Sequence, residues 1–364
     1  MKVLGLCSYP IEAPATRFRL YQFVKPLAER NIDLTICPFL DSETFSQFYT
    51  KKNIVHLSKG IIPALIKRSA SLLDVKKFDV IWVQREAMFF GPAIFENLYR
   101  IIGNRPMILD LDDPTYLSYT SPTFGKLGSY FKFFGKTDKL IENSRIVICG
   151  NQFIADYVRE KGTEAVIIPT VVDTEIFHPV NKPENDVPVI GWIGTHSTFP
   201  CLEIIFPVIQ QLAQKHQFKL KIVGSGKDKV EIKGVEIENS QWTLEREVSD
   251  FQFLDIGLYP VYAAGSLSAT WILGKSGFKA IQYLACGIPF VMSPVGVCSE
   301  IGEPNITHFN AVTEEDWYNS LDTLLSDSSL RNEMGARGRE YSLQNYTVST
   351  QADILANTFY KVKN

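Results

Sequence analysis

Short hydrophobic runs alternate along the chain with longer segments whose hydrophobic residues recur at helical spacing. The runs predict buried strands at residues 3–8, 34–39, 79–84, 107–111, 145–149, 165–168, 189–193, 220–224, 255–259 and 290–292. The segments between them predict helices, and three more helices are expected at 314–326, 328–344 and 348–362. Because strands alternate with helices, the pattern predicts an α/β fold built on doubly wound parallel sheets.

The strand series is interrupted between residues 169 and 188. This stretch contains four prolines and many polar residues, as interdomain linkers do. A chain of 364 residues is also long for a single domain. We therefore predict a first domain over residues 1–173, a linker at 174–188 and a second domain from residue 189.

Composition narrows the range of functions. A net charge of −3 argues against nucleic acid as the main partner. The six cysteines are scattered without a CxxC pair, which fits a reducing cytosol and disfavours structural zinc. No apolar run has the length of a signal peptide's core or a membrane span. We expect a cytoplasmic protein without metal or cofactor, and leave peripheral contact with the inner face of the membrane open.

Residues 274–292 read as a small-residue turn, a helix and a buried strand. Ser276 is placed to cap the helix, and Gly287 suits its left-handed exit. Lys275 and Lys279 stand with Gly277 at the mouth of the helix, where free backbone N–H groups and the helix dipole favour an anion. The alternative is an ordinary loop–helix–strand unit with surface lysines.

Ligands of doubly wound sheets bind at the carboxyl ends of the strands. Asp110, Asp112 and Asp113 follow one strand directly, and closely spaced carboxylates can act as a base or as cation ligands. The alternative is a polar helix cap before Pro114. The turn 194–198 after another strand is rich in hydroxyl groups but lacks the GxGxxG spacing of a dinucleotide site, which disfavours a nicotinamide enzyme.

Three segments with basic residues remain open in their interpretation. Arg17 and Arg19 stand at a predicted helix start, where they could face a phosphate. Arg85 follows a strand and could form a simple ion pair with Glu86. Residues 124–139 mix aromatic residues with four lysines, which suits either an ordinary helix or a segment resting on an anionic membrane.

The sequence resembles a retaining GT-B-fold glycosyltransferase of the large family 4 group, also called glycosyl transferases group 1. The resemblance covers nearly the whole chain and is firmest at residues 190–198, 253–260 and 274–296, with a further signature at 167–173. It implies two Rossmann-like domains facing across a cleft: an N-terminal acceptor domain and a C-terminal domain, at 189–345, that binds a nucleotide-diphosphate sugar. It also implies that a final helix at 346–364 crosses back to the first domain.

The resemblance also suggests site residues, although key positions depart from the family pattern. Many members carry two glutamates where this chain has Gly274 and Gln282, and the usual diphosphate arginine is absent. The implied donor residues are Gly194, Thr195, Ser197, Trp242, Ser276, Gly277, Phe278, Gln282 and Glu300, with Lys275 and Lys279 neutralising the diphosphate. Asp112 corresponds to the family's acceptor-domain histidine, so the resemblance implies a catalytic role for Asp112 beside Lys275 and Lys279. Arg17, Arg19, Arg85, Asp110 and Asp113 are assigned to the phosphate or acceptor side.

Together these expectations predict a metal-independent hexosyltransferase. It would move a sugar from a nucleotide-diphosphate donor to an acceptor hydroxyl, in polysaccharide or glycoconjugate biosynthesis. The acceptor would be a glycan or a lipid-linked molecule. Two alternatives stay open because both family glutamates are missing. One is a non-catalytic relative that binds a nucleotide or glycan, and the other is a sugar-nucleotide epimerase on the same fold.

Overall fold

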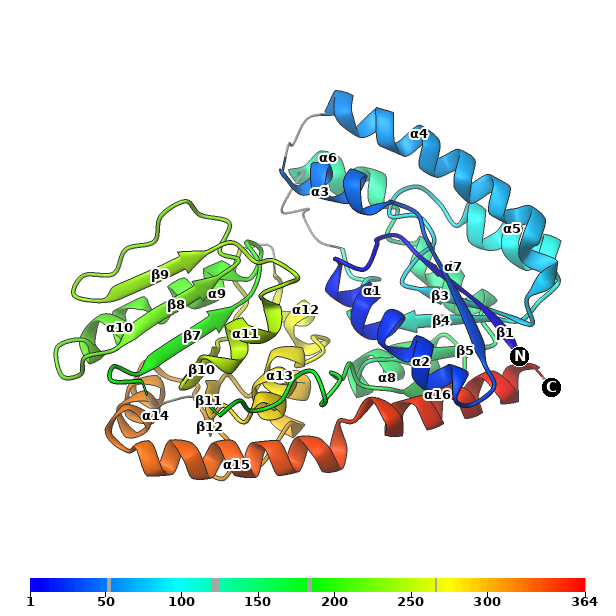
Figure 1. Cartoon of the computed structure of the whole chain (residues 1–364). Helices are drawn as coiled ribbons and strands as arrows, with labels where there is room; N and C mark the ends of the chain where they lie inside the picture. The colour runs from blue at the N-terminus through cyan, green and yellow to red at the C-terminus, as the bar shows by residue number, and fades with distance from the viewer. Residues whose placement is uncertain (51–53, 119–124, 182–184, 266, 364) are drawn as a thin grey trace. The chain divides into compact units, whose positions relative to one another are not determined.

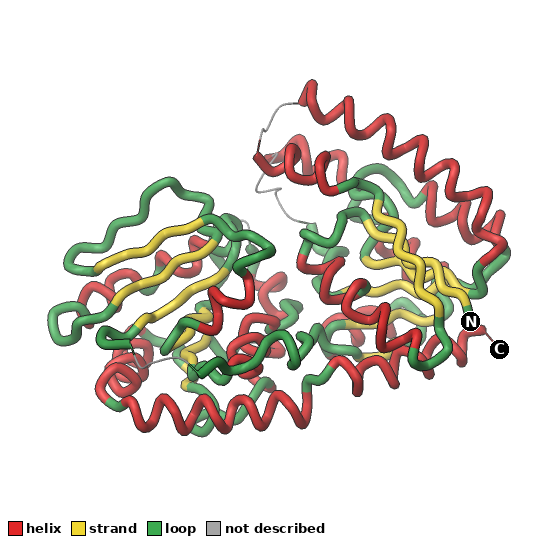
Figure 2. Tube along the Cα trace, in the orientation of Figure 1, coloured by secondary structure: helices red, strands yellow, loops and turns green. Residues whose placement is uncertain are grey.

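The computed structural model describes residues 1–50, 54–118, 125–181, 185–265 and 267–363. The chain forms two compact units, one from Met1–Thr170 with the C-terminal segment from Val348, the other from Val171–Thr347. Each unit is built on a six-stranded sheet whose paired strands are parallel (Figures 1 and 2). The prediction of a two-domain α/β fold is therefore confirmed.

The first unit contains β1 (Lys2–Cys7), β2 (Asp33–Pro38), β3 (Val80–Gln84), β4 (Met107–Leu111), β5 (Ile146–Cys149) and β6 (Ala165–Ile167), in the sheet order β2-β1-β3-β4-β5-β6. Its helices are α1 (Pro14–Arg19), η1 (Tyr21–Phe23), α2 (Val24–Ala28), α3 (Ser42–Thr50), α4 (Ile54–Ser71), η2 (Leu72–Lys77), α5 (Ile94–Gly103), α6 (Gly125–Lys132), α7 (Lys136–Asn143), α8 (Gln152–Glu160) and α16 (Val348–Lys363). Hydrophobic side chains of β1, β3, β4 and β5 form one continuous core with those of the helices.

The second unit contains β7 (Val189–Ile193), β8 (Lys219–Val223), β9 (Glu236–Ser240), β10 (Ile256–Tyr259), β11 (Phe290–Met292) and β12 (Phe309–Asn310), in the order β12-β11-β10-β7-β8-β9. Its helices are α9 (Phe199–Glu203), α10 (Phe206–Leu212), α11 (Glu247–Gln252), α12 (Ala269–Leu273), α13 (Phe278–Cys286), η3 (Gly296–Glu300), α14 (Glu314–Ser326) and α15 (Ser328–Asn345). If the strands of this unit are numbered from β7 as the first, their order in the sheet is that of a Rossmann fold.

The segment predicted as a linker, 174–188, lies within the second unit. Arg339 of α15 holds its first half, because Nη2 donates to the Thr174 carbonyl oxygen at 2.9 Å and Nη1 to that of Phe177 at 2.8 Å. Asn185 donates to Asp255 at 2.7 Å and holds the other end.

The last helix, α16, belongs to the first unit. Phe359 packs edge-on against Trp82 of β3, with 5.3 Å between the ring centroids. Arg30 Nε lies 2.7 Å from Asp353 Oδ1. No helix among the described residues is long and apolar enough to cross a membrane.

Candidate active site

The second sheet reverses its strand order between β7 and β10. In an open parallel sheet, ligands bind beyond the carboxyl ends of the strands at such a reversal. The turn 194–198 follows β7 at this point. The turn 274–277 leads into α13, the helix that precedes β11. Both segments of the predicted donor site therefore belong to loops at this edge.

The loops that follow β7, β8 and β9 are packed directly against one another. Gly224 has a φ of 82°, and a Cβ there would lie 2.3 Å from the carbonyl oxygen of Gly194 and 3.7 Å from Cβ of Trp242. A Cβ at Gly226 would lie 2.5 Å from Cβ of His196. Only glycine fits such close approaches, so Gly224 lets the loop after β8 pack against Gly194 and beside Trp242, and Gly226 lets it pack against His196. The sequence analysis did not assign these two glycines a role.

Hydroxyl groups line the turn after β7. Thr195 Oγ1 and Ser197 Oγ lie 2.8 Å apart, and the Thr198 hydroxyl donates to the Thr195 carbonyl oxygen at 3.1 Å. Thr195 itself is exposed. The turn can therefore present a hydroxyl donor to a ligand, but it carries no cation of the kind that usually binds a diphosphate.

The mouth of α13 differs from the prediction in one respect. The N-cap residue is Gly277, with a φ of 64° and no capping side chain, so the cap predicted at Ser276 is wrong. A Cβ at Gly277 would lie 2.2 Å from Cδ1 of Ile301, so the segment after β11 closes against this turn. The left-handed exit predicted at Gly287 is confirmed by its φ of 67°.

Lys279 lies in the first turn of α13 and is held by several groups. Its Nζ donates to Gln282 Oε1 at 2.8 Å, and it lies 5.1 Å from the ring centroid of Phe251 and 5.6 Å from that of Phe278. The aromatic faces favour a cation at this position. Gln282 is fully buried, and its Nε2 has no hydrogen-bond partner among the described residues.

Lys275 and Glu300 belong to two segments that meet beside α13. A Cβ at Gly296, the first residue of η3, would lie 2.4 Å from the carbonyl oxygen of Leu273, so η3 packs on the end of α12. Burial raises the pKa of the Cys298 thiol to about 12, while the nearby charge of Lys275 acts to lower it. Glu300 is exposed at the end of η3. Lys275 therefore lies near the η3 segment.

In the first unit, Arg19 and Asp110 form a fully buried ion pair. Arg19 Nε and Nη2 donate to the two Asp110 oxygens at 2.9 and 3.1 Å, and Nη1 donates to the Ile168 carbonyl oxygen at 2.7 Å. Burial raises the pKa of Asp110 to about 6, against the lowering effect of Arg19. The expectation that Arg19 faces a phosphate is corrected, because its guanidinium is enclosed by these acceptors.

Arg17 does not stand at a helix start either. Both arginines lie in the last turn of α1, which begins at Pro14. Arg17 Nη1 donates to the carbonyl oxygens of Ile11 and Glu12 at 2.9 and 3.2 Å, so it braces the loop after β1. Pro14 fits the first helical position, which explains why the helix starts earlier than the hydrophobic pattern predicted.

Arg85 pairs with two acidic residues beyond β4. Its Nε and Nη2 donate to the Asp112 oxygens at 2.5 and 2.7 Å, and Nη2 also lies 2.5 Å from Asp113 Oδ2. Burial alone raises the pKa of Asp112, but Arg85 more than offsets it, so the pKa lies below its usual range. A carboxylate held in this way is a weak proton acceptor, which disfavours Asp112 as a general base. No group of metal-ligating side chains suited to an ion occurs in the described parts of the chain.

Glu86 does not pair with Arg85, so that predicted ion pair is wrong. The carboxylate contacts Lys132 and lies 2.8 Å from Nζ of Lys136, which is itself buried. Two of the four lysines in the segment 124–139 are therefore tied to the protein interior. Residue 124 lies outside the described residues, whereas Tyr130, Phe131 and Phe133 are exposed.

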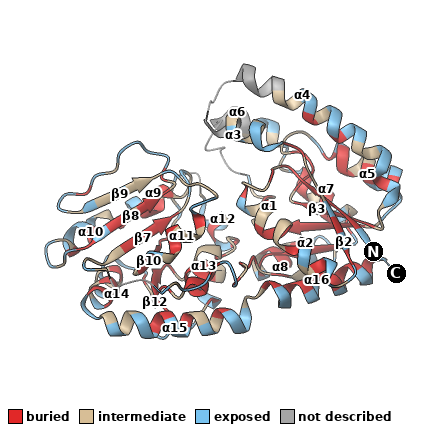
Figure 3. Cartoon of the chain, in the orientation of Figure 1, coloured by how far each residue is buried: buried red, intermediate tan, exposed pale blue. Residues whose placement is uncertain are grey.

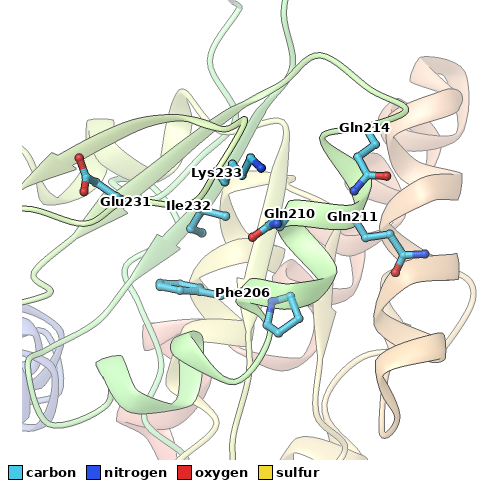
Figure 4. A pocket seen from close by; sticks show the side chains of 8 residues that line it. Phe206, Gln210, Gln211, Gln214, Glu231, Ile232 and Lys233 are labelled. Carbon is cyan, nitrogen blue, oxygen red and sulfur yellow. The ribbon is translucent and has the colours of Figure 1, made fainter.

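Two cavities lie away from the predicted donor site. One, of about 340 Å³, is lined by α10 and residues 231–233 (Figure 4). The other, of about 310 Å³, lies between the start of α5 and α7 in the first unit. Neither contains a residue of the predicted donor site.

Two Rossmann-like units with these strand orders, in one chain, define a protein of the GT-B fold. Residues 187–327 match the family model described as Glycosyl transferases group 1. The match lies within the second unit and agrees with the family that the sequence resembles. No match was found among the curated proteins.

Solved structures match the chain over nearly its whole length. HepE from Anabaena, solved in complex with UDP, has 15% identity and a TM-score of 0.68, covering 99% of this chain and 100% of its own. Sucrose-phosphate synthase from Thermosynechococcus elongatus has 15% identity, a TM-score of 0.66 and 99% coverage of both chains. A glycosyltransferase from Rickettsia africae has 14% identity and a TM-score of 0.70, with coverages of 99% and 98%. At these identities the likeness concerns the fold.

Proposed function

We propose that the protein is a glycosyltransferase that moves a sugar from a nucleotide-diphosphate donor to an acceptor hydroxyl. One observation supports this most strongly: the second unit matches the group 1 family model, and its packed loops lie at the strand-order reversal where such a sheet binds its ligand. The donor would lie between the turn 194–198 and the mouth of α13.

The diphosphate is proposed to lie at the mouth of α13, next to Lys279 and Lys275. Catalysis would come mainly from positioning and from stabilising the charge that develops on the leaving diphosphate. The Gln282 amide, whose Nε2 has no partner among the described residues, would support the ribose or the neighbouring phosphate. Trp242 would flank the base, while Thr195 and Ser197 donate to phosphate oxygens and Glu300 approaches the sugar.

Three finer properties belong to the same proposal. Transfer would retain the anomeric configuration, the sugar would be a hexose, and no metal would be needed because lysines and a helix N-terminus meet the diphosphate charge. HepE has been solved with UDP and with UDP-glucose, and TarM with UDP and α-GlcNAc-glycerol. A uridine nucleotide is therefore the first donor to test.

The acceptor would be a glycan or a lipid-linked molecule in polysaccharide or glycoconjugate biosynthesis, bound by the first unit. Asp112 and Asp113, held by Arg85, would provide a fixed negative surface there rather than a base. The exposed rings of Tyr130, Phe131 and Phe133 are consistent with contact between this segment and a membrane or a lipid acceptor.

The test is incubation with radiolabelled UDP-, GDP- and dTDP-sugars and a panel of glycan and lipid acceptors. The proposal expects a glycoside product whose anomeric configuration, read by NMR, matches the donor, formed equally well with a chelator present. Binding without transfer or hydrolysis would favour the non-catalytic relative that the missing glutamates at Gly274 and Gln282 suggest. Release of a free epimerised sugar would select the epimerase.

A further inference from the structure

The outer side of α4 and η2 carries large hydrophobic residues that face solvent. Ile62, Ile66 and Leu73 are 59%, 66% and 86% exposed. Ile62 and Ile66 are four residues apart and lie on one side of α4, and Leu73 follows in the 3-10 helix η2. Figure 3 shows exposed bands along α4 and α5. Scattered exposed hydrophobic residues are ordinary, but a group of them on neighbouring elements favours an interaction surface.

The C-terminal half of α5 extends this surface. Ile101 and Ile102 of α5 are 66% and 40% exposed. The helix packs against η2, because Gly103 approaches Val75 so closely that a Cβ would lie 2.8 Å from Cγ2 of the valine. We call the exposed side of residues 60–77 and 94–105 the α4–α5 face.

The charges on the α4–α5 face are nearly all positive. Its exposed charged residues are the cations Lys67, Lys76, Lys77, Arg100 and Arg105 and the single carboxylate Asp74. Their net charge is +4, whereas the whole chain carries −3. The other two charged side chains are buried: Arg68 donates to backbone carbonyl oxygens, and Glu96 accepts from the backbone N–H of Ala87.

We propose that the α4–α5 face docks on an anionic lipid bilayer. Large aliphatic side chains flanked by lysine and arginine fit the boundary between headgroups and acyl chains. The aliphatic side chains enter the hydrocarbon there, and the lysine and arginine side chains contact the lipid phosphates. A second copy of the chain fits poorly, because two faces of charge +4 would repel each other. The proposal is independent of the transferase activity.

The test is co-sedimentation of the full chain with vesicles of pure phosphatidylcholine or of equal parts phosphatidylcholine and phosphatidylglycerol. The wild type is expected to bind the anionic vesicles only, and less tightly as salt is raised. A cation near an anionic surface is worth about fivefold in affinity, so the loss of two in Lys67→Gln/Lys76→Gln should weaken binding about 25-fold. Ile62→Ser/Ile66→Ser should weaken it at least about tenfold.

The control pair is Ile204→Ser/Ile306→Ser, two exposed isoleucines of the second unit, which should bind like the wild type. All substituted side chains are exposed, so we expect every variant to fold, and thermal melting of each variant checks this. A competing surface is tested with Tyr130→Ser/Phe131→Ser of the α6 segment.

Several results would overturn the proposal. The first is that the wild type binds neither kind of vesicle, and the second is that it binds both equally. The third is that the variants of the α4–α5 face bind like the wild type. Loss of binding in the Tyr130→Ser/Phe131→Ser variant alone would move the contact to that segment. If Ile62→Ser/Ile66→Ser instead abolished self-association in sedimentation velocity, without vesicle binding by the wild type, the partner would be a second copy.

Discussion

His308 is completely buried in the second unit, and its protonation is expected to weaken folding as the pH falls. Its ring stacks on Phe290 of β11 with 4.9 Å between centroids, and its nitrogens lie 2.9 Å from Thr307 Oγ1 and 3.2 Å from Asn310 Oδ1. Burial lowers the pKa of His308 from 6.5 to about 4, although the contact with Asn310 acts to raise it.

The direction of the effect follows from which state takes up the proton first. In the unfolded chain His308 becomes protonated below about pH 6.5, whereas in the folded chain it stays neutral down to about pH 4. The stability from the neutral ring is complete above the unfolded pKa and is lost as the pH falls toward the folded pKa. With about 1.4 kcal/mol per pKa unit, the full loss is about 3 kcal/mol, of which about 2 kcal/mol has been lost at about pH 5.

The assay is urea unfolding at about pH 7 and about pH 5, followed by tryptophan fluorescence. Four of the five tryptophans lie in the second unit, so the signal reports mainly on the unit that contains His308. The wild type should lose about 2 kcal/mol between the two pH values, and His308→Gln, whatever its absolute stability, should lose much less. An equal loss in both proteins would refute the buried neutral histidine.

Three further outcomes are expected. Lys279→Ala should weaken nucleotide-diphosphate binding at least about tenfold in a calorimetric titration, whereas Lys229→Ala, an exposed lysine paired with a neighbouring glutamate, should not; equal affinities would remove Lys279 from the site. Arg19→Leu should cost about 3–5 kcal/mol in chemical unfolding because Asp110 is left buried and unpaired, and a cost below about 1 kcal/mol would contradict the buried pair. Gly277→Val should reduce nucleotide affinity by straining the left-handed turn before α13, while wild-type affinity would show that this turn does not shape the site.

Most strands of the two sheets could be predicted from the sequence, because the central strands are buried on both faces and form continuous hydrophobic runs. The prediction missed the two strands at the edges of the second sheet. β9 (Glu236–Ser240) has the sequence EIENS and contains no fully buried residue, so it lacks that signal. β12 (Phe309–Asn310) has only two residues, too few to show any periodicity.

The side-chain partners were the least predictable part. Arg19 and Asp110 are separated by 91 residues, and only the folded sheet places α1 over the end of β4. The pairing of Arg85 with Asp112 rather than Glu86 has the same origin. Arg85 adopts a φ of 58° after β3, a local turn that no spacing in the sequence reveals.

For the proposed donor site, the sequence predicted the elements better than the contacts between them. The helix–strand unit 274–292 lies at the expected edge, and its left-handed exit at Gly287 is as predicted. The glycines at 224 and 226 were assigned no role, because their role depends on a backbone approach between loops of different strands. The position of Phe251 beneath Lys279 was likewise invisible, since it comes from a separate helix.

The central claim is that the second unit binds a nucleotide-diphosphate donor at the carboxyl edge of its sheet. Its most direct test is the melting temperature of the full chain titrated with UDP, GDP and dTDP and with their sugars. We expect one base to give a saturable rise in Tm, corresponding to about 2.7 kcal/mol of stabilisation when the ligand reaches about 100 times its Kd. No rise with any of these nucleotides would contradict the claim.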